Sequence, residues 1–179
     1  MKKHFFFVLF TLFSTIVLSQ NNRVNGKIIK NFGQTFSLEN PEIKTNTAAE
    51  LKVIFDVSST SSKNNVINKN IVTAARFLNM HANEGMNLEQ LKVAITIHGA
   101  AWKDVLTDGA YKTKFGVVNP NTKLIKELKD AGVDIIICGQ TASFRKMDKS
   151  LVNPNVKFAL SAMTALLQYQ NNGYKFIKF

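Results

Sequence analysis

The sequence predicts a three-layer α/β/α domain with a mainly parallel sheet of about five strands. Segments rich in β-branched and aromatic residues alternate with helical patterns of about 10–15 residues, which is typical of βαβ units. The run "IIIC" (135–138) is apolar on both faces, as expected of a central parallel strand covered by two helical layers. Right-handed crossovers place the connecting helices on both faces of such a sheet.

The predicted strands are recognised by composition and by the turn residues around them. The first, "LKVIFDVSS" (51–59), is β-branched and aromatic and ends in a serine-rich loop. The last, "YKFIKF" (174–179), alternates apolar and polar residues. The five segments that contain the predicted strands are 51–59, 91–99, 133–138, 152–160 and 174–179.

The predicted helices follow from apolar periodicity and from start and stop signals. In 66–82, apolar residues recur at spacings of three and four, which indicates an amphipathic helix. The segment 119–132 begins with Asn and Pro and ends at a glycine, which are typical helix boundaries. Further helices are predicted at 141–147 and 161–173, whereas 102–118 has no steady period and is predicted to be a long irregular connection.

The chain is predicted to have three parts: a signal peptide (1–19), an N-terminal arm (20–48) and the α/β domain (49–179). The first part has two lysines, a short apolar run and a cleavage point expected near Ser19. Its apolar runs are shorter than the roughly 20 residues of a membrane-spanning helix, the alternative interpretation. We therefore expect a periplasmic or secreted protein with no stable membrane span after cleavage. The arm is polar, with a short strand predicted at 27–29.

Composition argues against several classes of function. The formal net charge is +11, and loss of the two leader lysines would leave 11 − 2 = +9. The other lysines are scattered and aromatic residues do not interleave with them, so no nucleic-acid partner is expected. Gly-rich nucleotide-binding motifs do not occur, and no cofactor is expected. His81, His98 and Cys138 lack the spacing of metal ligands, so no metal site is expected either.

Two strand ends carry the residues that suggest chemistry. Ligands of open α/β sheets bind beyond the carboxyl ends of the strands. The segment "ITIHGAAW" places His98, Gly99 and Ala100 at that edge, and "IIICGQTA" places Cys138 there. His98 is alternatively a strand-end histidine bonded to a neighbouring carbonyl. The only cysteine of the chain excludes an intramolecular disulfide, so the thiol is buried, paired between chains or used.

The residues after Cys138 favour a reactive thiol. Gly139 permits a tight turn, and Gln140 and Thr141 begin a helix whose N-cap is expected to be Thr141 or Ser143. Free backbone N–H groups and the positive end of the helix dipole would lower the pKa of the thiol below about 8.5. The alternative is a small buried hydrophobic residue, which is a common fate of free cysteines.

Three stretches together resemble the DsrE/DsrF-like (YchN-like) superfamily, in its exported single-domain branch. They are "ITIHGAAW", "NPNTKLIKELKDAGVDIIICGQTA" and "VKFALSAMTALLQYQNNGYKFIKF". The resemblance implies a five-stranded α/β/α domain that assembles into homo-trimers or hexamers. It also implies sulfur relay, in which a cysteine carries a persulfide between a donor and an acceptor protein. That cysteine corresponds to Cys138, and the histidine of the "HG" strand end corresponds to His98.

Two functions remain open from the sequence. In the first, the protein is a sulfur carrier or is similar to a sulfurtransferase: Cys138 and His98 act, and Gly99, Ala100, Gly139, Gln140 and Thr141 bind the transferred group. In the second, the protein is a non-catalytic module that binds a small ligand or serves as an oligomeric scaffold. A redox function is disfavoured because no second cysteine can resolve a disulfide within the chain.

Overall fold

The computed structural model describes residues 23–178 of the chain. The predicted signal peptide and the first residues of the arm lie outside this range. Within residues 23–178, no helix has both the length and the apolar character needed to cross a bilayer.

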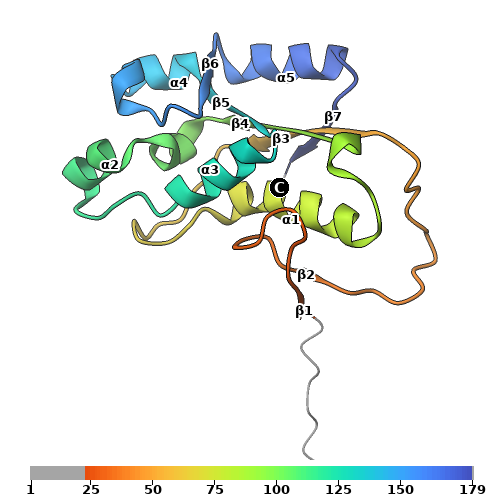
Figure 1. Ribbon diagram of the computed structural model, residues 1–179. Helices are drawn as coiled ribbons and strands as arrows, with labels where there is room; N and C mark the ends of the chain where they lie inside the picture. Colours follow the sequence, from red (N-terminus) through yellow and green to blue (C-terminus); the bar gives the residue numbers. More distant parts are fainter. Residues whose placement is uncertain (1–22, 179) are drawn as a thin grey trace, which may run out of the picture.

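The centre of the fold is a five-stranded parallel sheet with the strand order β6-β5-β4-β3-β7. Helices cover both of its faces (Figure 1), so the predicted three-layer α/β/α class is confirmed. The predicted strands are all present, although shorter than the segments that contain them. Their bounds are β3 (Leu51–Val57), β4 (Leu91–Ile97), β5 (Asp134–Cys138), β6 (Lys157–Ala159) and β7 (Lys175–Lys178).

The two helical layers differ in thickness. The lower layer in Figure 1 contains α1 (Lys69–Asn83), α2 (Asp108–Phe115) and α3 (Thr122–Asp130) and covers the larger part of the buried core. The other face is covered by α5 (Ala162–Asn171), whereas α4 (Gly139–Phe144) lies on the opposite side of β6 from α5 and packs through Ala142 against the same core as α1 and α3. Three short 3-10 helices complete the domain: η1 (Leu88–Gln90), η2 (Gly99–Val105) and η3 (Lys149–Leu151).

The sheet register decides which side chains meet at the carboxyl ends of the strands. Asp56 of β3 is opposite Thr96 of β4, and Thr96 is opposite Ile136 of β5. Side chains alternate between the two faces along each strand, so His98 and Cys138 lie on the same face as Asp56. This face is covered by α5, which contacts β3, β4 and β5.

The connection 102–118 is not irregular as predicted. It contains most of η2 and the helix α2, which begins after Thr107, whose hydroxyl accepts a hydrogen bond from the Ala110 amide. Tyr111 is the buried residue of α2, and its hydroxyl donates to the carbonyl of Asn64. A helix that is stabilised by a cap and one buried aromatic ring shows little apolar periodicity. The sequence pattern therefore did not predict α2.

The N-terminal arm also differs from the prediction. Residues 27–29 do not form a strand, and the arm instead contains the antiparallel pair β1 (Arg23–Val24) and β2 (Thr35–Phe36). The backbone between these strands is bound by Asn79 of α1, which is completely buried. Its amide oxygen accepts from the backbone N–H groups of residues 28 and 29, and its amide nitrogen donates to three arm carbonyls.

Candidate functional site

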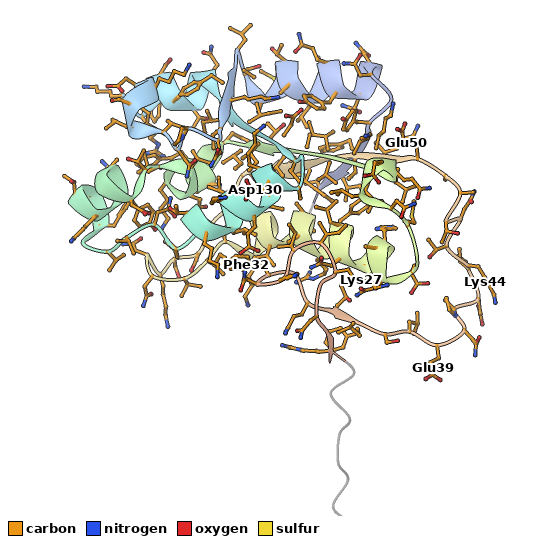
Figure 2. The ribbon with its side chains drawn as sticks, in the orientation of Figure 1. Lys27, Phe32, Glu39, Lys44, Glu50 and Asp130 are labelled. Atoms are coloured by element: carbon orange, nitrogen blue, oxygen red, sulfur yellow. The ribbon has the colours of Figure 1, made fainter. Side chains whose placement is uncertain are left out.

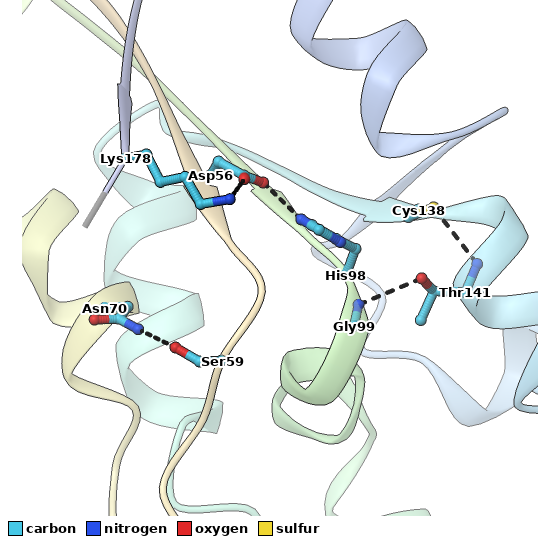
Figure 3. Close-up of polar contacts among 8 residues, drawn as sticks. All are labelled: Asp56, Ser59, Asn70, His98, Gly99, Cys138, Thr141 and Lys178. Atoms are coloured by element: carbon cyan, nitrogen blue, oxygen red, sulfur yellow. Dashed lines mark hydrogen bonds and ion pairs between the residues drawn. The ribbon is translucent and has the colours of Figure 1, made fainter.

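Cys138 ends β5 and is itself the N-cap of α4, in place of Thr141 or Ser143 as predicted from sequence. Its Sγ atom accepts a hydrogen bond from the Thr141 amide, with a nitrogen to sulfur distance of 3.4 Å (Figure 3). The residue is buried, with 5 % of its surface exposed. The following Gly139 approaches β6 so closely that a Cβ atom there would lie 2.6 Å from the carbonyl oxygen of Ala159.

The electrostatics of the thiol result from two opposing effects. Burial raises the pKa of Cys138, because a thiolate loses its hydration. Hydrogen bonds from the amide and hydroxyl of Thr141, and from the amides of Ala162 and Gln140, lower the pKa by more. The net shift is downward. The thiol is thus buried as a structural cysteine would be, and is also surrounded by donors that stabilise its anion.

His98 follows the last residue of β4 and is paired with a carboxylate on the neighbouring strand. Its Nε2 atom lies 2.8 Å from Oδ1 of Asp56, and Oδ2 of Asp56 lies 3.2 Å from Nζ of Lys178 (Figure 3). Asp56 is buried, whereas the His98 side chain is partly exposed. In the neutral imidazole, the carboxylate favours the tautomer with its proton on Nε2, which leaves Nδ1 as the acceptor.

His98 and Cys138 are neighbours in the sheet without direct contact. The imidazole points toward Asp56 (Figure 3), and no hydrogen bond joins His98 to Cys138 among the described residues. Thr141 connects the two strand ends instead. Its hydroxyl oxygen accepts from the Gly99 amide over 3.4 Å, and its amide donates to the sulfur.

The other predicted binding residues are distributed around this connection. The backbone of residues 139–141 forms the first turn of α4, and the amides of Gln140 and Thr141 are directed at the Cys138 sulfur. The Ala100 amide is not directed at Cys138, because it donates to the carbonyl of Ser58 over 2.8 Å. The Gln140 side chain donates to the carbonyl of Leu160 over 3.3 Å.

Sequence reasoning missed three polar residues on this face. Asp56 and Lys178 form the charged pair beside His98, and the hydroxyl of Thr96 is buried without a hydrogen-bond partner among the described residues. One signal was available for Asp56, because a carboxylate inside an otherwise apolar strand needs a partner when buried. Nothing in the sequence indicated that Lys178, from the last strand, would be that partner.

A buried carboxylate fixes the position of η2, the helix that directly follows His98. Asp104 accepts hydrogen bonds from the side chains of Thr60, Asn68 and Asn121 over 2.9, 2.7 and 3.2 Å. Burial raises the pKa of Asp104 in spite of these hydrogen bonds. The network ties the loop after β3 to η2 and to the start of α3.

Within residues 23–178, no group of three or more His, Cys, Asp or Glu side chains is arranged to hold a metal ion. The polar groups of the site are a thiol surrounded by donors, a histidine paired with a carboxylate, and a lysine on that carboxylate.

Comparisons with solved structures agree with this fold. The structure is similar to that of the protein of unknown function MTH1491 from Methanobacterium thermoautotrophicum, with 16 % identity and a TM-score of 0.55. It is also similar to the ychN protein from E. coli, with 13 % identity and a TM-score of 0.54. Each match covers 72 % of this chain and 99 % of the other, and establishes the fold.

Sequence comparison gives a family but no individual relative. No curated protein sequence matches the chain significantly. The family model described as the DsrE/DsrF-like family matches residues 52–179, which include both β-strand ends of the site. The chain belongs to the DsrE/DsrF-like family.

Proposed function

We propose that the protein is a sulfur carrier in which Cys138 holds a persulfide and passes its outer sulfur to an acceptor. The family to which the chain belongs is associated with sulfur relay. The observation that carries the proposal is the set of donors around the sulfur, which lowers the pKa of Cys138 although the residue is buried. A thiolate is the form of cysteine that attacks sulfur.

The transfer needs no oxidant or reductant. The Cys138 thiolate attacks the outer sulfur of a donor persulfide R–S–SH, the S–S bond of the donor breaks, and the donor leaves as the thiolate R–S⁻. A new S–S bond now joins Cys138 to the transferred sulfur. The acceptor thiolate repeats the same exchange in the other direction. In this proposal His98, oriented by Asp56, accepts or returns a proton at Nδ1 as the thiol and the persulfide ionise.

Access to the sulfur requires a movement of the connection between β6 and α5. The carbonyls of Ala159 and Leu160 lie against Gly139, and the Ala162 amide contributes to the sulfur environment. Leu160 itself is exposed. Displacement of this short connection opens the sulfur without breaking the sheet, so a partner that contacts Leu160 can control the exchange.

The proposed partners are a sulfur donor protein, a sulfur acceptor protein and further copies of this chain. Exposed apolar side chains of α5 and of the connection that precedes it support an assembly into a homo-trimer or hexamer. They are Leu160, Met163 and Leu167. Sedimentation velocity of the native protein and of Leu167→Glu tests the assembly.

We also propose that the protein acts outside the cytoplasm. N-terminal sequencing of the mature protein and cell fractionation test this location.

Sulfur loading tests the function directly. The purified protein is incubated with a small-molecule persulfide, and its intact mass is measured before and after treatment with a reductant. We expect the mass of one added sulfur atom in the native protein, its loss on reduction, and no addition to Cys138→Ser. A native protein that takes up no sulfur, while its denatured form does, would exclude the proposal.

The low exposure of Cys138 favours one alternative, a non-catalytic ligand-binding or scaffold protein of the same fold. The two functions differ in thiol accessibility. A disulfide reagent of the size of a small persulfide should react with the native protein at a measurable rate if the thiol is used. Reaction only at the rate of global unfolding supports the alternative.

A further inference from the structure

A hollow of about 970 Å³ lies between the N-terminal arm and α1, away from Cys138. Its walls include residues 31–38 of the arm and the side chains of Val72, Arg76 and Met80 of α1. The family match begins at residue 52, so one wall of the hollow belongs to a part of the chain that precedes the matched domain. The volume is within the range of about 300–1,000 Å³ that is usual for small-molecule sites.

The arm is fixed against α1, so the hollow has a rigid wall. Asn79 binds the arm backbone through both of its amide atoms, and Lys27 donates from Nζ to the carbonyl of Ala82 over 3.2 Å. Gly33 has a positive φ of 68°, and a Cβ atom there would lie 2.5 Å from the backbone of Arg76. In Figure 2, Lys27 and Phe32 lie beside the domain, whereas Glu39 and Lys44 lie on the outer loop of the arm.

The part of the arm beyond these contacts presents apolar side chains to solvent. Phe36, Leu38 and Ile43 line the hollow and are 65, 70 and 90 % exposed. Met80, on the opposite wall, is also exposed. Neighbouring exposed apolar side chains around a concave surface are typical of ligand-binding grooves.

Two arginines of the hollow have no carboxylate partner among residues 23–178. Arg76 projects from the middle of the α1 wall, between Val72 and Met80 at spacings of four residues. Arg23 lies over the ring of Phe36, with 5.5 Å between its guanidinium carbon and the ring centroid. Glu84 also lines the hollow, one turn beyond Met80. Guanidinium groups beside apolar walls are complementary to an anionic head group with an apolar tail.

We propose that this hollow binds an amphipathic carboxylate, such as a medium-chain fatty acid. The carboxylate head accepts hydrogen bonds from Arg76 and Arg23, and the chain lies against Phe36, Leu38, Ile43 and Met80. The site is separate from Cys138 and does not rest on sulfur transfer. The arm thus adds a ligand-binding function to a domain whose family match does not include it.

Calorimetric titration of the native protein with dodecanoate tests this inference. We expect saturable 1:1 binding, with dodecanol at least tenfold weaker because it lacks the charge. Arg76→Ala should weaken dodecanoate binding about tenfold and leave dodecanol unchanged, as expected for loss of one charge-assisted hydrogen bond. The matched control is Arg145→Ala, which removes an equal charge beside Trp102 and should leave binding unchanged.

Gly33→Ala provides a second test, because it displaces the arm wall without removing charge or apolar surface. We expect loss of dodecanoate binding with an unchanged far-ultraviolet circular dichroism spectrum, which checks that the variant remains folded.

Four outcomes would overturn the inference: no saturable binding, equal binding of dodecanol, an unchanged affinity in Arg76→Ala, or a concentration-dependent dimer that Leu38→Asp dissociates. The last would show that a second copy of the chain covers the hollow.

Discussion

The imidazole of His98 donates from Nε2 to the buried carboxylate of Asp56, and this contact joins the ends of two neighbouring strands. The same carboxylate accepts from Lys178 on the other side, so three strands are connected by one acidic side chain. The arrangement gives the histidine a fixed ring orientation and gives the edge strand β7 a charged anchor. Both properties can be tested by substitution.

Asp56→Asn should lower the free energy of unfolding by about 1–3 kcal/mol at pH 7, measured by urea denaturation. The amide nitrogen of asparagine replaces one carboxylate oxygen, so either His98 or Lys178 loses its acceptor. The matched control is Asp130→Asn, which breaks the exposed pair with Lys126 and should cost less than about 0.5 kcal/mol. Equal losses in the two variants would show that the pairing of Asp56 is not a structural anchor.

The rate of Cys138 alkylation should rise with pH, with a midpoint below that of the same cysteine in the unfolded chain. The pKa is lowered because donors stabilise the thiolate, so removal of a donor should move the midpoint upward. Thr141→Val removes the hydroxyl and keeps the amide, and is expected to raise the midpoint. Ser143→Ala, on the same helix, is the control and should leave it unchanged. A midpoint above that of a cysteine in the unfolded chain would contradict the assignment of the donors.

Gly139→Ala should destabilise the domain by about 1–3 kcal/mol, because the added methyl group would clash with the backbone carbonyls of Ala159 and Leu160. Gly109→Ala is the matched control, since nothing lies within 4 Å of a Cβ atom there and the residue is helical. Alanine should be neutral or stabilising by up to about 1 kcal/mol at that site. Differential scanning calorimetry distinguishes the two, and a neutral Gly139→Ala would mean that β6 separates easily from α4.

The Tyr169→Phe variant should be less stable than the native protein by about 1 kcal/mol at neutral pH, with a smaller difference in acid. Tyr169 donates to Asp134 over 2.6 Å. Burial raises the pKa of Asp134, but hydrogen bonds from Lys157 and Tyr169 lower this pKa by a larger amount. The folded pKa therefore lies below 3.8. A depressed carboxyl pKa contributes stability above the unfolded pKa, and this contribution is lost as the pH falls through the folded pKa. Urea denaturation at pH 7 and near pH 3 measures the change.

Tyr174→Phe is the control for this linkage. Its ring packs edge-to-face on Tyr169, with 4.9 Å between the ring centroids, and its hydroxyl makes no hydrogen bond to Asp134. The substitution should therefore leave the pH dependence of stability unchanged. A Tyr169→Phe variant with the same loss at both pH values would show that the hydroxyl acts through packing alone.

The sheet was predictable because strand composition and helix periodicity are local properties. Segments such as 91–99 and 133–138 gave β4 and β5 directly, and the place of Cys138 at a strand end followed from them. The helix α2 was missed because only Tyr111 of its residues is buried, and the strand expected at 27–29 is replaced by backbone bonds to Asn79. Contacts of this kind depend on side chains far apart in the sequence, and no local pattern encodes them.

The site likewise contains residues that the sequence could place and residues that it could not. His98, Cys138 and Thr141 could be placed at one edge from the sequence, because parallel strands end on the same side of a sheet. Asp56 and Lys178 could not, because their pairing depends on which strand lies beside β3. The N-cap of α4 shifted to Cys138 for a chemical reason: its sulfur accepts the Thr141 amide, a role that sequence preferences assign to oxygen side chains.

The position of Lys178 in β7 has a consequence for biosynthesis. Asp56 belongs to the first strand of the sheet to be synthesised, and its ammonium partner belongs to the last. In a nascent chain this acid has no lysine partner until β7 has been made, so the ion pair at this edge of the sheet forms late. A substitution of Lys178 would therefore affect His98 through their shared carboxylate, although the two residues are far apart in the sequence.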